Sequence, residues 1–149
     1  MTTLRELEAR LLRCEQETSN EKDGNGKFIF RLENGDVHFW STEPSRWVFR
    51  PVATVGEAHG VSFLCPKSYA TNGGAKGTHS VYVFFAGSPY AGRNKEGKEV
   101  RWNVVSGSTI DDLSLKPSIQ EQDEGMPADH QCNWHGFVGS SGVPPGSAA

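Results

Sequence analysis

A short C-terminal stretch, HQCNWHG at residues 130–136, concentrates side chains that bind metals or carry protons. It places His130, Cys132 and His135 within six positions. The C-x-x-H spacing of Cys132 and His135 suits a tight turn in which both side chains converge on one tetrahedral ion, as in zinc sites. The stretch has three interpretations: part of a zinc site, half of a catalytic pair, or a polar turn.

A further ligand of the same kind lies upstream, in the segment LCPKS. Cys65 begins a pattern that resembles a C-P-x-C knuckle, but Ser68 stands where the second cysteine would be. Cys65, Cys132 and His135 therefore supply three of the four ligands of a C-x-x-C plus C-x-x-H zinc site.

The fourth ligand position has three physical interpretations. In the first, His79 or His130 fills it and gives a closed structural site. In the second, water fills it and gives the open geometry with which catalytic zinc generates a nucleophile. In the third, no metal is bound and the Cys/His cluster is a polar remnant.

Length and composition restrict the class of protein. The chain has 149 residues, of which 36% are hydrophobic, and a formal charge of -3. This size fits one domain over residues 1–138, followed by a Gly/Pro/Ser/Ala tail at residues 139–149. The charges form no basic stripe, so we expect no nucleic-acid partner. No apolar run reaches the roughly 20 residues of a membrane helix, so we expect an intracellular protein outside the membrane.

The N-terminal segment has the pattern of an amphipathic helix. Leu4, Leu7 and Leu11 recur at spacings of three and four, and Thr2 or Thr3 is available as an N-cap. This pattern predicts a helix over about residues 2–17.

From residue 27 to residue 138 the pattern predicts strands, because β-branched and aromatic runs alternate with turn residues. The segment ENGD predicts a hairpin in which Asn34 and Gly35 take the positive φ angles of a type I′ turn. The glycine-rich segment after Cys65 is expected to be a loop. The predicted fold is mainly β (α+β), a small antiparallel β sandwich or curled sheet with an N-terminal helix.

Three segments together resemble a known family. GVSFLCPKSYATNGGAKGTHSVYVFFAG, WNVVSGSTIDDLSLKPSI and CNWHGFV, in that order, look like a domain family of unknown function found in tailed-phage genomes. Shorter relatives lie beside bacterial ubiquitin-like operons. Some members carry the label ammonia monooxygenase, which does not suit this chain because a membrane-embedded copper enzyme needs apolar spans. The resemblance implies a phage-encoded protein of the virion or the host cytoplasm.

The shorter relatives also suggest a peptidase-like role. The serine of PSI and the histidine of WHG in this family fall on Ser118 and His135, and Asp111 or Asp112 could orient His135. One histidine cannot both bind a metal and act as a general base, so this role competes with the zinc site. The segment STIDDL also fits a capped turn in which Thr109 accepts from the backbone and Asp112 reaches back.

Three functions therefore stand as hypotheses. The first is a non-enzymatic phage protein, a structural component of the virion, in which zinc bound by the Cys/His cluster staples the fold. The second is a hydrolase of the peptidase type that uses zinc-bound water or the Ser118 and His135 pair. The third is a cytoplasmic protein-interaction module. The first and third imply protein partners, either other virion subunits or further copies of the chain.

Overall fold

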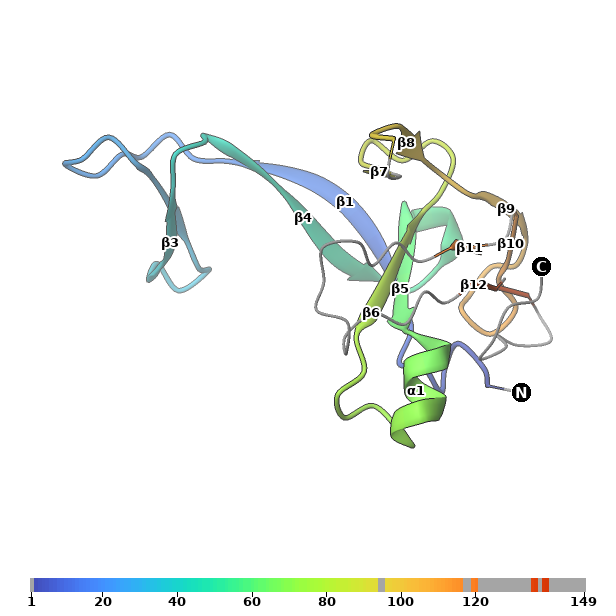
Figure 1. The fold of residues 1–149 in the computed structure, drawn as a ribbon. Coiled ribbons are helices and arrows are strands. Elements are labelled where there is room, and N and C mark those ends of the chain that lie inside the picture. Colours follow the sequence, from blue (N-terminus) through green and yellow to red (C-terminus); the bar gives the residue numbers. More distant parts are fainter. Residues whose placement is uncertain (1, 94–95, 117–118, 121–134, 137, 140–149) are drawn as a thin grey trace. The chain divides into compact units, whose positions relative to one another are not determined.

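The structure is a computed structural model that describes residues 2–93, 96–116, 119–120, 135–136 and 138–139 (Figure 1). The chain divides into two compact units. Unit 1 comprises Met1–Arg13 and Pro51–Ala149, and unit 2 comprises Cys14–Arg50. Within the described residues, no helix has both the length and the apolar character to cross a membrane. The predicted boundary between domain and tail at residue 138 stays a prediction.

Antiparallel strands dominate the described structure, which confirms the prediction of a mainly β fold. The largest sheet has the strand order β4-β1-β5-β6, and the remaining strands form the pairs β10-β9, β11-β12, β2-β3 and β7-β8. The elements are β1 (Arg10–Thr18), β2 (Phe28–Arg31), β3 (Val37–Ser41), β4 (Ser45–Val52), η1 (Val55–Glu57), β5 (Gly60–Leu64), α1 (Pro66–Asn72), β6 (Ser80–Phe84), β7 (Gly92–Arg93), β8 (Glu99–Val100), β9 (Asn103–Ser106), β10 (Ser114–Lys116), β11 (Ile119–Gln120) and β12 (His135–Gly136).

The predicted N-terminal helix over residues 2–17 is wrong. The helix signal produces a single capped turn, in which Thr3 Oγ1 accepts the Glu6 N–H at 3.1 Å and the Thr3 carbonyl accepts the Leu7 N–H at 3.1 Å. Glu8 then takes a φ of 53°, in the left-handed region, and this ends the turn. The strand β1 begins at Arg10.

The physical reason lies in the pairing of this segment with β5, which buries its apolar side chains. Leu11 lies opposite Val61 of β5, and Leu11, Leu12 and Cys14 of β1 are all buried. An isolated helix of this length is marginal in water, so tertiary pairing decides the outcome. Leu4 and Leu7 are buried as well, but they lie in the N-terminal turn and not in the strand.

The core of unit 1 is built on the central strands β5 and β6. Their register places Val61 opposite Val83 and Phe63 opposite Val81, and because side chains alternate along a strand, all four share one face. Each of the four is at most 5% exposed. The same core contains Cys65 of the predicted zinc motif and Val138, which follows His135 by three residues.

In unit 2 the predicted hairpin is confirmed, but its type I′ turn is wrong. Among the described residues other than glycine, only Glu8 has a positive φ, so Asn34 does not, whereas Gly35 has a φ of 93°. The Gly35 N–H donates to the Leu32 carbonyl at 3.0 Å, and the Leu32 N–H donates to the Asp36 carbonyl at 2.8 Å. The loop is therefore one residue longer, and a single left-handed glycine closes it.

Candidate functional site

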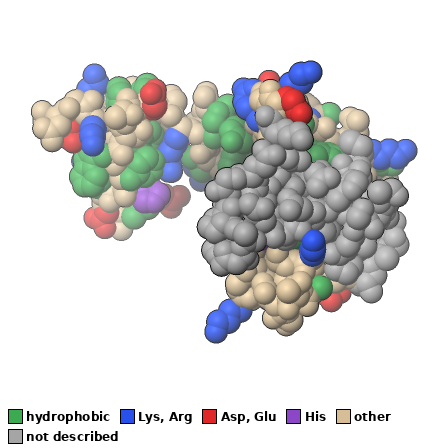
Figure 2. Space-filling view, in the orientation of Figure 1, with side chains coloured by type: hydrophobic (Ala, Val, Ile, Leu, Met, Phe, Trp, Pro, Cys, Tyr) green, Lys and Arg blue, Asp and Glu red, His purple; other side chains and the backbone are tan. Residues whose placement is uncertain are grey.

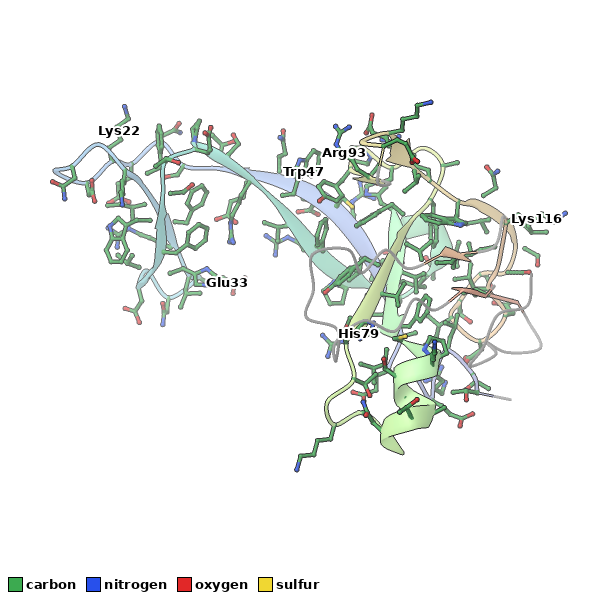
Figure 3. All side chains as sticks on the ribbon, in the orientation of Figure 1. Lys22, Glu33, Trp47, His79, Arg93 and Lys116 are labelled. Atoms are coloured by element: carbon green, nitrogen blue, oxygen red, sulfur yellow. The ribbon has the colours of Figure 1, made fainter. Side chains whose placement is uncertain are left out.

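The end of the β5-β6 ladder brings Cys65, Ser68 and His79 together. The Cys65 N–H donates to the His79 carbonyl at 2.8 Å, one step beyond the last strand pair. Ser68 Oγ lies 3.4 Å from His79 Nδ1, within hydrogen-bonding distance. Figure 3 shows His79 just before β6, beside the start of α1. Two predicted zinc ligands, and the serine that replaces a third, are thus neighbours in space.

Ser68 owes its position to α1, a helix that the sequence interpretation assigned to a loop. Pro66 occupies the first turn of this helix, and Gly73 ends it with a φ of 69°, its N–H donating to the Tyr69 carbonyl. Proline just inside the start and glycine just past the end are the signature of a short helix. The segment PKSYATNG carries that signal, which was available in the sequence.

The C-terminal end of the motif pairs with a strand that contributes Ile119 to the same core. Gln120 pairs with His135, and Ile119 pairs with Gly136, in the β11-β12 ladder. Three residues after His135, Val138 is 1% exposed and its carbonyl accepts the Leu115 N–H at 3.0 Å.

Several predicted site residues cannot be placed. Ser118, His130 and Cys132 lie outside the described residues, as does the side chain of His135. In the part of the chain that the structure describes, no group of three or more His, Cys, Asp or Glu side chains could hold a metal ion. The described donors, Cys65 and His79, are of the types that zinc prefers, so zinc binding stays a prediction.

Cys65 has the environment of a structural residue. Its side chain is 0% exposed, and it belongs to the apolar core of unit 1, whereas His79 is half-buried. A cysteine in such surroundings is inert toward external reagents but well placed to hold an ion shielded from water.

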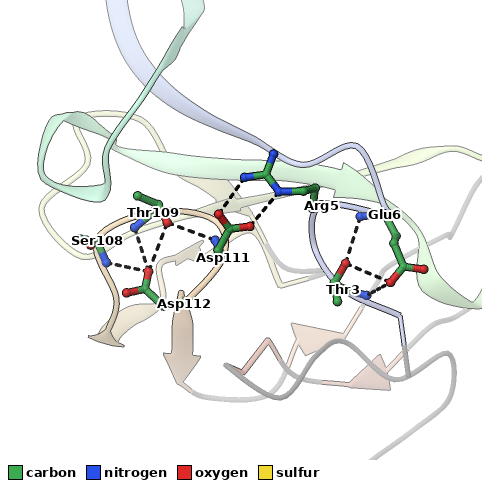
Figure 4. A network of polar contacts seen from close by, with 7 residues as sticks. All are labelled: Thr3, Arg5, Glu6, Ser108, Thr109, Asp111 and Asp112. Atoms are coloured by element: carbon green, nitrogen blue, oxygen red, sulfur yellow. Dashed lines mark hydrogen bonds and ion pairs between the residues drawn. The ribbon is translucent and has the colours of Figure 1, made fainter.

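Asp112, the predicted orienting residue of the hydrolase hypothesis, caps its own loop (Figure 4). Its Oδ1 accepts the N–H groups of Ser108 and Thr109, both at 2.9 Å. Thr109 Oγ1 in turn accepts the Asp111 N–H at 3.3 Å, which confirms the capped turn. The backbone N–H groups of Thr109 and Ser108 lower the pKa of Asp112, because they stabilise its charged form. The triad with Ser118 and His135 stays a prediction.

The neighbouring Asp111 binds a residue from the other end of the chain. Arg5 Nε donates to Asp111 Oδ1 at 2.8 Å, and Arg5 Nη2 donates to Asp111 Oδ2 at 2.7 Å (Figure 4). This hydrogen bonding to Arg5 lowers the pKa of Asp111. The pair joins the N-terminal turn to the loop at residues 107–112, and the sequence interpretation missed it because no local pattern connects residues so far apart.

Comparison of the chain with protein-family models, with curated proteins and with solved structures finds no match in any of the three. The resemblance to the phage domain family therefore rests on its three sequence motifs.

Proposed function

We propose that this chain is a phage-encoded, non-enzymatic structural protein that binds other protein subunits of the virion. The observation that carries the proposal is the β2-β3 hairpin of unit 2, which carries apolar side chains on both faces. On one face Phe30 and Phe39 stack with ring centroids 4.9 Å apart. The guanidinium of Arg46 lies 4.5 Å from the Phe39 centroid and 5.3 Å from the Phe30 centroid, so it covers this face.

The opposite face of the hairpin carries apolar surface that reaches solvent. Ile29 lies directly opposite Trp40, and the Trp40 side chain is 54% exposed. Arg31 shares this face with Ile29, whereas Leu32, at the start of the turn and 47% exposed, follows the Phe30 side of the strand. Figure 2 shows hydrophobic side chains at the surface of unit 2 among charged ones. Tryptophan is among the residues that contribute most to protein-protein binding, so this face is suited to contact another subunit.

Unit 2 also has little core of its own. Within Cys14–Arg50, all of which is described, the buried hydrophobic side chains are Cys14 and Phe30. Units below about 40 residues usually need a metal, disulfides or association to be stable. A partner that covers Trp40 would therefore stabilise the hairpin as well as bind it.

The second part of the proposal is a zinc staple in unit 1. Cys65 and His79, together with Cys132 and His135, would hold the ion. Bound zinc would cross-link the end of the β5-β6 ladder to the C-terminal segment, and cross-links of this kind add to folding stability. The proximity of Cys65 to His79 supports His79 as a candidate for the fourth ligand, beside His130.

The test uses phage particles assembled from genomes that encode the wild-type chain, Trp40→Ser or Val105→Ser. Val105 lies on β9 of unit 1 and is 52% exposed, so it is a matched control for loss of an exposed apolar side chain. Quantitative mass spectrometry should find the wild-type and Val105→Ser chains at the same copy number, and the Trp40→Ser chain several-fold depleted. Absence of the wild-type chain from particles would overturn the virion role. Equal incorporation of Trp40→Ser would overturn the role of the hairpin.

A further inference from the structure

A groove of about 310 Å³ lies within unit 1, away from the Cys65 and His79 cluster. The N-terminal turn, the start of β1, the end of β4 and the loop at residues 107–112 form its walls. Pro51, Val52 and Ile110 contribute apolar surface to it. Charged side chains complete the lining, namely Arg5, Arg10 and Asp111.

The charges of this groove do not cancel. Arg5 and Asp111 neutralise one another in their two-point ion pair. Arg10 is exposed, and its guanidinium makes no hydrogen bond or ion pair with any residue that the structure describes. One uncompensated positive charge therefore stands beside an apolar surface, and a partner that carries both a carboxylate and an aliphatic group would complement it.

The walls of the groove are held in place before any partner binds. Glu8, two residues before Arg10, has a φ of 53°, a strained conformation that persists only where the surroundings enforce it. On the other wall Asp112 caps the loop through Ser108 and Thr109. A preformed site loses less conformational entropy on binding, which favours recognition of a short segment.

We propose that this groove binds an extended protein segment in which an acidic residue stands next to an aliphatic one. The aliphatic side chain covers Pro51, Val52 and Ile110, and the carboxylate pairs with the Arg10 guanidinium, whose planar donors match it in a two-point contact. A volume of about 310 Å³ lies at the lower end of the range for binding pockets, so it accommodates one or two side chains. This inference stands apart from the hairpin of unit 2 and does not depend on it.

The experiment probes the full-length protein with an array of acetylated hexapeptides. Their two central positions combine an aliphatic residue with an acidic, basic or neutral polar one. We expect selective retention on the aliphatic-acidic peptides, with the strongest of them binding in fluorescence anisotropy measurements. Arg10→Glu should weaken this binding about tenfold, because it replaces attraction with repulsion. Ile110→Ser should weaken it by removing part of the apolar surface.

Two control variants establish whether the peptides bind at this groove. Lys116→Glu reverses an exposed charge on β10 outside the groove, and Trp40→Ser alters the hairpin; both should bind the peptides as the wild type does. Circular dichroism melts of all variants establish that they are folded. No preference for aliphatic-acidic peptides, or equal binding by Arg10→Glu, would overturn the proposal. If Lys116→Glu weakened peptide binding as much as Arg10→Glu, the binding would be general charge attraction, and the proposal would be overturned too.

Discussion

Arg5 and Asp111 form a two-point ion pair across a sequence separation of 106 residues, with Nε–Oδ1 and Nη2–Oδ2 distances of 2.8 and 2.7 Å. Their side chains are 67% and 57% exposed. Exposed ion pairs contribute little to stability, so the importance of this pair is geometric. It fixes the N-terminal turn against the capped loop and thereby sets the width of the groove beside Arg10.

The Asp111→Asn variant should be slightly less stable than the wild type near neutral pH. The hydrogen bonds from Arg5 hold the pKa of Asp111 below its ordinary value. The resulting stabilisation is fully present above the unfolded pKa of about 3.9 and is lost as pH falls through the lower folded pKa. Urea denaturation from pH 7 to pH 2 should show the difference between the two proteins closing at the acid end. A difference that persists unchanged at the lowest pH would contradict this assignment.

Gly107→Ala should destabilise unit 1 more than Gly97→Ala does. Both glycines have positive φ, 109° and 80°, so both substitutions carry the strain of a left-handed alanine, about 1–2 kcal/mol. At Gly107 the added Cβ would also lie 2.7 Å from the Cα of buried Leu113, whereas at Gly97 nothing lies within 4 Å. We expect an additional loss of about 1–3 kcal/mol in the free energy of unfolding. Equal losses would show that the loop relaxes freely.

The strands of this fold could be predicted from sequence because their apolar residues alternate. Val61 and Phe63, or Val81 and Val83, occupy every second position, which no helix would bury together. Leu4, Leu7 and Leu11 have the spacing of a helix, but a turn followed by a strand buries all three equally well. The competition between these two arrangements is decided by the pairing of β1 with β5, which is not visible locally.

The candidate site was predicted only in part for a related reason. The C-P-x-S pattern predicts Cys65 as a ligand, and the structure adds that His79 is its cross-strand neighbour. Pairing between residues 14 positions apart depends on the length of α1 and of the loop that follows it. The sequence interpretation missed that helix, so it could not predict that His79 lies beside Cys65.

Arg46→Lys should loosen the aromatic hairpin of unit 2, although it keeps the positive charge. The guanidinium of Arg46 lies over the rings of Phe30 and Phe39 and also pairs with Glu17 at 2.8 Å. Lysine lacks the planar group that stacks on aromatic faces, so we expect a loss of about 0.5–1 kcal/mol.

Hydrogen exchange of the β2 and β3 amides measures this loss locally. Arg50→Lys is the matched control, since Arg50 also lies on β4 and pairs with a glutamate, Glu15, at 2.9 Å. Hydrogen exchange of the hairpin amides in Arg50→Lys should equal that of the wild type. Equal exchange in Arg46→Lys would show that the ion pair with Glu17, and not the stacking, holds Arg46 in place.

Protein purified without chelators should contain one zinc ion per chain by elemental mass spectrometry. Cys65→Ser should lose the ion, because serine is a poor zinc ligand, and its melting temperature should fall. Cys14→Ser is the control, since Cys14 is also a buried cysteine but belongs to unit 2. The Cys14→Ser protein should retain zinc even if the substitution destabilises unit 2.

Ser68→Cys completes the C-P-x-C pattern and should tighten zinc binding by at least about tenfold in competition with a chelator, because a thiolate replaces a hydroxyl. Ser68 Oγ already lies 3.4 Å from His79 Nδ1, so a sulfur at this position would stand beside that candidate ligand. If the wild type contains no zinc and Ser68→Cys does, the ligands converge but the natural chain has lost the metal. If neither protein binds zinc, Cys65 and His79 are neighbours for packing alone, and the zinc staple is wrong.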